Sequence, residues 1–211
     1  MDPIRDILQF HRPLDDETFK REAKRLSTAA QSERWLYMET EESKREPWQG
    51  DVCPGLRLAF VAEDGQIEEY VGTVMLLSTT CDAVPGQDPY AVFAPVFAVA
   101  EFLEGLTAAQ QTSKLNALKG GHYARYLYLP AANGYPDSYV DFSQAASVST
   151  RYAERIFEDA PLGARLRLSR LGWYFFNYKL GYYYARAEDE GEIPRRTTIQ
   201  NTWAVVDGAD H

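Results

Sequence analysis

Residues 50–62 have the sequence GDVCPGLRLAFVA, and residues 71–77 have the sequence VGTVMLL. In the first stretch large apolar residues alternate with other residues from Leu56 to Phe60, which is the period of a strand with one buried face. The second stretch is apolar almost throughout, as in a buried central strand. Asp64-Gly65, between them, is a typical hairpin turn pair. The two stretches therefore predict a β-hairpin, from Val52 to Leu77, whose second strand is buried and central in the sheet.

Strands and helices are predicted on both sides of this hairpin. Further strands are expected at Tyr90–Ala100, Tyr123–Pro130, Ser138–Phe142 and Arg165–Leu168, with Ser147–Glu158 as a strand that leads into a helical turn. Helices are expected at Leu14–Met38 and Ser169–Arg186, and a helix or a helical loop at Glu101–Leu118. Pro95 interrupts the first of these strands, so we expect it at an edge or a bulge. The mixture predicts an α+β fold.

The chain divides into three parts on this pattern. Residues 1–47 form an N-terminal helical extension with a charged linker from Glu39 to Pro47, residues 48–187 form the main domain, and residues 188–211 form a loose charged tail. A length of 211 residues is compatible with one large domain and terminal additions.

Charge is distributed unevenly along a chain whose net charge is −9. From Asp51 to Glu104 there are nine acidic residues and one basic residue, Arg57, whereas from Gly105 onward there are eleven acidic and twelve basic residues. Binding to a phosphate backbone depends on Lys and Arg. An RNA partner would therefore have to bind the C-terminal third of the chain.

Composition gives no sign of secretion, a membrane span or a metal. The start, MDPIRDILQF, has acids where a signal peptide needs a basic start, and no apolar run reaches the roughly 18 residues of a membrane span. Cys53, Cys81 and His122 lack the paired spacing of zinc ligands. We expect a cytoplasmic protein without a metal or another cofactor.

The segment Ser78-Thr79-Thr80-Cys81-Asp82 stands where a buried strand passes into a loop, which is where scaffolds present functional groups. Ser78, Thr80, Cys81 and Asp82 are therefore candidate catalytic residues, with Cys81 as a possible nucleophile. The acid beside Cys81 would disfavour a thiolate. The favoured interpretation is structural: the hydroxyls cap a turn, and Cys81 is a small buried apolar residue.

Basic residues form the one candidate surface for an anionic ligand. The patch consists of Arg151, Arg155, Arg165, Arg167, Arg170 and Lys179. Arg165, Arg167 and Arg170 follow one another through the last strand and into the last helix, and with Tyr174 or Tyr178 nearby they would suit phosphate binding and base stacking. The favoured alternative is a solvated face on which arginines pair with neighbouring acids such as Glu158.

The last predicted helix is apolar on most sides. Trp173, Phe176, Tyr178 and Tyr182 are its candidate interface residues, because exposed aromatic side chains mark docking surfaces. Burial in the core of the domain explains the same pattern equally well.

Three short motifs resemble the PemK/MazF family of bacterial toxins. They are Gly50-Asp51-Val52, the strand Val74–Ser78 and Phe93–Val96, and they span about the middle quarter of the chain. The resemblance implies a small SH3-like β-barrel, here with an appended N-terminal helix and a long aromatic C-terminal helix. It also implies a toxin–antitoxin or anti-phage setting, and RNA cleavage by an arginine, a role that Arg57 would fill. Where the family has a later hydroxyl, this chain has Phe97 and Ala98.

Two functions follow from these patterns. The first is a non-catalytic interaction or adaptor protein that binds a protein partner or forms a homodimer. The alternative is a toxin-like endoribonuclease whose site combines Arg57 with Ser78–Asp82. The acidic middle of the chain favours the first function.

Overall fold

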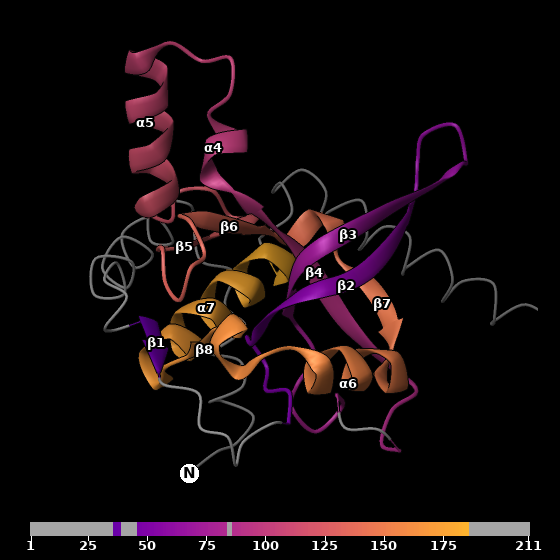
Figure 1. The fold of residues 1–211 in the computed structure, drawn as a ribbon. Helices are drawn as coiled ribbons and strands as arrows, with labels where there is room; N and C mark the ends of the chain where they lie inside the picture. The colour runs from indigo at the N-terminus through magenta and orange to yellow at the C-terminus, as the bar shows by residue number, and fades with distance from the viewer. Residues whose placement is uncertain (1–35, 39–45, 84–85, 186–211) are drawn as a thin grey trace, which may run out of the picture.

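The computed structural model describes residues 36–38, 46–83 and 86–185, and these form an α+β domain (Figure 1). The strands are β1 Tyr37–Met38, β2 Val52–Val61, β3 Ile67–Leu76, β4 Tyr90–Ala98, β5 Tyr126–Leu129, β6 Ser138–Asp141, β7 Ala146–Ser149 and β8 Arg167–Leu168. The helices are α4 Val99–Phe102, α5 Ala108–Lys119, α6 Thr150–Asp159 and α7 Arg170–Ala185, with 3-10 helices η1 Phe142–Gln144 and η2 Leu162–Ala164. The α+β class expected from the sequence is confirmed.

The strands form one antiparallel sheet of six strands and one separate pair. The sheet has the order β2-β3-β4-β6-β5, with β7 beside β4, and β1 pairs with β8. A single bridge between Val52 and Leu166 links the sheet to the pair. Among the described strands none joins β2 to β5, so the sheet is open and the expected SH3-like barrel is not confirmed.

The ends of the chain fall mostly outside the described residues, among them residues 14–35 of the predicted N-terminal helix, residues 39–45 of the linker and the whole of the tail from residue 188. Where the predicted helix should finish, Tyr37 and Met38 form β1 instead. That part of the prediction is wrong because these two residues pair with Leu168 and Arg167 of β8.

The predicted hairpin is confirmed as β2 and β3. Its turn has Gly65 at a φ of 82°, a left-handed conformation that glycine adopts without steric cost, and the Ala62 N–H donates to Gln66 O at 2.8 Å. Figure 1 shows this end of the hairpin projecting from the body, and we call residues 57–71 the arm. Burial along β3 starts only at Val74, so the expectation that the strand is buried from Val71 is wrong: Val71 is 59% exposed.

Pro95 lies inside β4, at a break in the neighbouring ladder. The carbonyls of Val92 and Val96 accept hydrogen bonds from the β3 side, so by alternation the nitrogen of Pro95 faces the opposite edge. On that edge η1 separates β6 from β7 and shifts their register against β4 by three residues. The missing N–H of proline is tolerated there because no regular ladder continues past it. The expectation that Pro95 interrupts the strand at an edge or a bulge is wrong, since β4 runs through it between β3 on one side and β6 and β7 on the other; the irregularity lies in those two partner strands.

Each face of the sheet is covered by helices. One face packs against α7 and the β1–β8 pair, and this core contains Met75, Ala94, Val96, Leu127, Val140, Phe175 and Phe176. The other face packs against α6 at one end, through Val74, Leu76, Phe93, Ala153 and Phe157, and against α4 and α5 at the other, through Val99, Leu118, Tyr126 and Tyr128. Burial of each large apolar side chain contributes about 2 kcal/mol.

Local capping sets the helix boundaries. The helix or helical loop expected from Glu101 to Leu118 consists of two helices, because Thr107 starts α5 with a reciprocal capping box to Gln110. The start predicted for the last helix is confirmed: Ser169 Oγ accepts a hydrogen bond from the Gly172 N–H at 3.1 Å.

Candidate functional site

The Ser78–Asp82 segment is a turn that its own hydroxyls hold together. Ser78 Oγ accepts from the Val92 N–H at 2.8 Å, and Thr80 Oγ1 accepts from the Gln49 N–H at 3.1 Å. Thr79 Oγ1 donates to Asp82 Oδ2 at 2.7 Å. These side chains satisfy backbone groups where β3 leaves the sheet, which is the capping role favoured above.

Cys81 lies in this turn but is exposed, so its interpretation as a small buried residue is wrong. The buried cysteine is Cys53, and burial raises the pKa of its thiol to about 12. A thiol with so high a pKa is held in its protonated, unreactive form at neutral pH.

Arg57 is not brought to the Ser78–Asp82 turn. It lies on the arm opposite Val71, and its Nη1 contacts Glu69 Oε2 at 3.2 Å. Both side chains are more than half exposed, so this ion pair stabilises the arm little. The turn lies at the other end of the hairpin, where Thr80 bonds to Gln49 just before β2. The proposed catalytic residues therefore do not converge on one reacting atom.

Arg167 forms a buried ion pair with Asp51, and both side chains are 2% exposed. Its Nε donates to Asp51 Oδ1 at 3.0 Å and its Nη2 donates to Oδ2 at 2.7 Å, a two-pronged contact that suits the planar guanidinium. Nη2 also donates to Glu46 O at 2.8 Å, and the guanidinium lies 4.2 Å from the Trp48 ring centre. Burial raises the pKa of Asp51, and Arg167 opposes that rise by favouring the carboxylate.

Arg165 and Arg170, the neighbours of Arg167 in the expected anion-binding surface, differ from each other. Arg165 is 1% exposed and lies 5.2 Å from the Phe157 ring centre. Arg170 is exposed and lies over Tyr174 at 5.7 Å. The expectation of one exposed arginine surface is wrong, because Arg165 and Arg167 are buried among core side chains and, of the three, only Arg170 faces solvent. The alternative of a solvated arginine face is wrong for the same two residues.

The aromatic side chains of α7 divide between the core and the surface. Phe176 is fully buried and packs against Phe142, with ring centres 6.2 Å apart, so its assignment to an interface is wrong. Tyr178 and Tyr182 are half-buried. Trp173 is 39% exposed, and its Nε1 donates to Gln49 Oε1 at 3.0 Å. Of the four expected interface residues, Trp173 is the most exposed.

Lys179 does not belong to an exposed basic patch, so its place in the expected anion-binding surface is wrong. It is fully buried, and its Nζ donates to Gly121 O at 2.8 Å and to Tyr123 O. Burial lowers the pKa of Lys179 to about 7. The lysine joins α7 to the loop that connects α5 with β5, which is a structural role.

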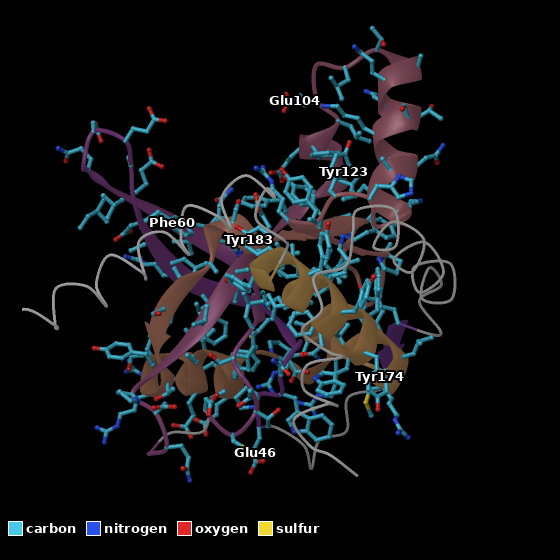
Figure 2. The ribbon with its side chains drawn as sticks, turned by 180° about the vertical axis from the view of Figure 1, so that it is seen from behind. Glu46, Phe60, Glu104, Tyr123, Tyr174 and Tyr183 are labelled. Atoms are coloured by element: carbon cyan, nitrogen blue, oxygen red, sulfur yellow. The ribbon has the colours of Figure 1, made fainter. Side chains whose placement is uncertain are left out.

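Several large apolar side chains lie at the surface, and of these only Trp173 is an interface candidate from the sequence. Those exposed among the described residues are Met38, Val61, Ile67, Val71, Tyr90, Trp173, Tyr174 and Tyr184. Val61, Ile67 and Val71 belong to the arm, and Trp173, Tyr174 and Tyr184 belong to α7. Figure 2 shows Phe60 on the arm and Tyr174 on α7 at opposite sides of the domain, so the two groups are separate surfaces.

The described part of the chain contains no group of three His, Cys, Asp or Glu side chains arranged to hold a metal ion. No helix among the described residues is both long enough and apolar enough to cross a bilayer. Comparison with protein-family models, with curated proteins and with solved structures finds no match to this chain.

Proposed function

We propose that this chain is a non-catalytic interaction or adaptor protein, which binds a protein partner or a second copy of itself. The proposal rests on the contacts of the candidate catalytic side chains, which bind backbone groups or a surface acid and do not face one another. Ser78 and Thr80 bond backbone N–H groups, and Arg57 pairs with Glu69 away from them. A nucleophile and its activating groups must lie within hydrogen-bond reach of one another. Large apolar side chains exposed on the arm and on α7 support the interaction role.

The setting of this function is part of the same proposal. The motifs at Gly50–Val52, Val74–Ser78 and Phe93–Val96 resemble those of PemK/MazF toxins, and they lie here in β2, β3 and β4 and at their ends. We place the protein in the cytoplasm of a bacterium, in a toxin–antitoxin or anti-phage system. On this view the open sheet is a derivative of the SH3-like barrel whose catalytic hydroxyl has been replaced at Phe97 and Ala98.

Endoribonuclease activity is the second candidate. Its support is the exposure of Arg57, at 58% of its side chain, which an RNA phosphate could reach. Against it stand the four acids of the arm, which would repel the RNA backbone around that arginine.

Affinity capture from the native host, followed by size-exclusion chromatography with light scattering, tests the proposal. RNA content and RNA cleavage are assayed in the same fractions. We expect a defined protein complex or a homodimer without cleaved RNA, which is unchanged by Thr80→Ala. A monomer that cleaves RNA and loses this activity with Arg57→Ala or Thr80→Ala, while it stays folded, would contradict the proposal and support the ribonuclease.

A further inference from the structure

The arm carries its exposed apolar side chains on one face only. The antiparallel register pairs Arg57 with Val71, Ala59 with Glu69, and Val61 with Ile67, and side chains of paired residues point to the same side of a ribbon. We call these six residues the outer arm face. Val61 is 77% exposed, Ile67 72% and Val71 59%. The opposite face contains Leu56 and Leu58, which are buried under α6.

The outer arm face continues a face of the sheet that is covered elsewhere. By strand alternation Val71 lies on the same side of β3 as Met75, which is fully buried in the core beneath α7. Toward Ile67 the face leaves this cover and exposes Val61, Ile67 and Val71 beside the Arg57–Glu69 ion pair. An apolar face directed to solvent is typical of a docking surface when polar groups surround it.

The charge around this face defines what can cover it. The arm contains the acids Glu63, Asp64, Glu68 and Glu69, and its one base is Arg57. A second copy of the arm would bring like charges together, and a nucleic acid would add phosphates to carboxylates. A surface of opposite charge is attracted instead.

We propose that the outer arm face docks a protein surface that has an apolar centre and a rim of lysine and arginine. The inference rests on the proposed function and adds to it a place and a chemistry for the partner. The apolar centre covers Val61, Ile67 and Val71, and the basic rim faces the acids at the tip and along β3. Charges of this kind chiefly guide association and select among partners, whereas the buried apolar contacts supply the affinity.

The test measures binding of two synthetic amphipathic peptides to the full chain by fluorescence anisotropy. Both peptides present the same leucine stripe, flanked by lysines in one and by glutamates in the other. We expect the lysine peptide to bind and the glutamate peptide not to bind. Ile67→Ser should weaken binding about tenfold, which corresponds to the loss of one central apolar contact. Tyr90→Ser, at an exposed apolar residue outside the arm, is the matched control and should leave binding unchanged.

Charge is tested with two double variants that change the net charge equally. Glu63→Lys with Glu69→Lys, at the tip and on the outer arm face, should weaken binding of the lysine peptide about tenfold. Glu104→Lys with Glu158→Lys, on exposed acids of other elements, should weaken it far less. Figure 2 shows Glu104 on the part of the domain that carries α4 and α5, apart from Phe60 on the arm. Circular dichroism and thermal unfolding of each variant verify that it is folded.

Several outcomes would overturn the inference. Both charge variants could weaken peptide binding equally, the two peptides could bind alike, or neither peptide could bind. The inference would also be wrong if the protein were a homodimer that Ile67→Ser converts to a monomer. Failure here remains distinguishable from failure of the proposed function. A partner captured from the host that binds the arm variants as well as the native protein would refute this surface and leave the interaction role in place. RNA cleavage by a monomer would instead refute the interaction role itself.

Discussion

Replacement of Arg167 by methionine should destabilise the domain strongly. The substitution removes both prongs of the contact with Asp51, at 3.0 and 2.7 Å, and the bond to Glu46 O at 2.8 Å. It leaves a carboxyl group that is 2% exposed without its counter-charge, and removal of one partner from a buried pair costs about 3–5 kcal/mol. At about 2–4 °C per kcal/mol for a protein of this size, the melting temperature should fall by about 6–20 °C.

The measurement is urea unfolding followed by circular dichroism, with Arg170→Met as the matched control. Arg170 is exposed, so its replacement should change the free energy of unfolding by less than about 0.5 kcal/mol. Asp51→Asn combined with Arg167→Met should cost less than the sum of the single substitutions, because asparagine leaves no buried charge behind. The reasoning holds that the pair is shielded from water and that each charge needs the other. It would be refuted if Arg167→Met lowered the free energy of unfolding by less than about 1 kcal/mol, or if the effects of the two single substitutions added up to that of the double variant.

Three further predictions concern single buried or exposed groups. Lys179 has a pKa of about 7 in the fold against 10.5 for an ordinary lysine, so between these values the unfolded chain binds more protons than the fold. The free energy of unfolding should therefore rise between pH 7 and 9, by at most about 1.4 kcal/mol per pH unit, and Lys179→Met should flatten this dependence in urea titrations. A Cβ at Gly172 would lie 2.3 Å from the backbone oxygen of Leu36, so Gly172→Ala should lower the free energy of unfolding by about 1–3 kcal/mol. A Cβ at Gly181, in the same helix, would meet nothing within 4 Å, so Gly181→Ala should raise it by up to about 1 kcal/mol. Cys81 is exposed and Cys53 is buried, so a chromogenic disulfide should label one thiol in the folded protein and two in denaturant; two labelled thiols under native conditions would contradict the assigned burial.

The parts of the fold that were predicted correctly depend on short stretches of sequence. The alternation in β2, the turn at Asp64-Gly65 and the cap at Ser169 depend on residues close to one another in the chain. Strand alternation and helix capping act over a few residues, so the hairpin and α7 were predictable.

The candidate site was less predictable, because burial of polar side chains depends on partners distant in sequence. Arg165 and Arg167 have the spacing of an exposed basic strand, yet both are buried, and the partner of Arg167 lies 116 residues earlier at Asp51. The Ser78–Asp82 turn was correctly given a capping interpretation, although the sequence could not identify Gln49 and Val92 as the groups that it caps.

The sequence by itself determined the α+β class, the β2–β3 hairpin and the acidic charge of the middle of the chain, because each depends on composition or on neighbouring residues. Only the tertiary structure decided which faces are covered. Val71 and Met75 share one side of β3, but α7 extends over Met75 and not over Val71. Burial is a property of the assembled layers, since an apolar side chain is hidden only where another element packs against it.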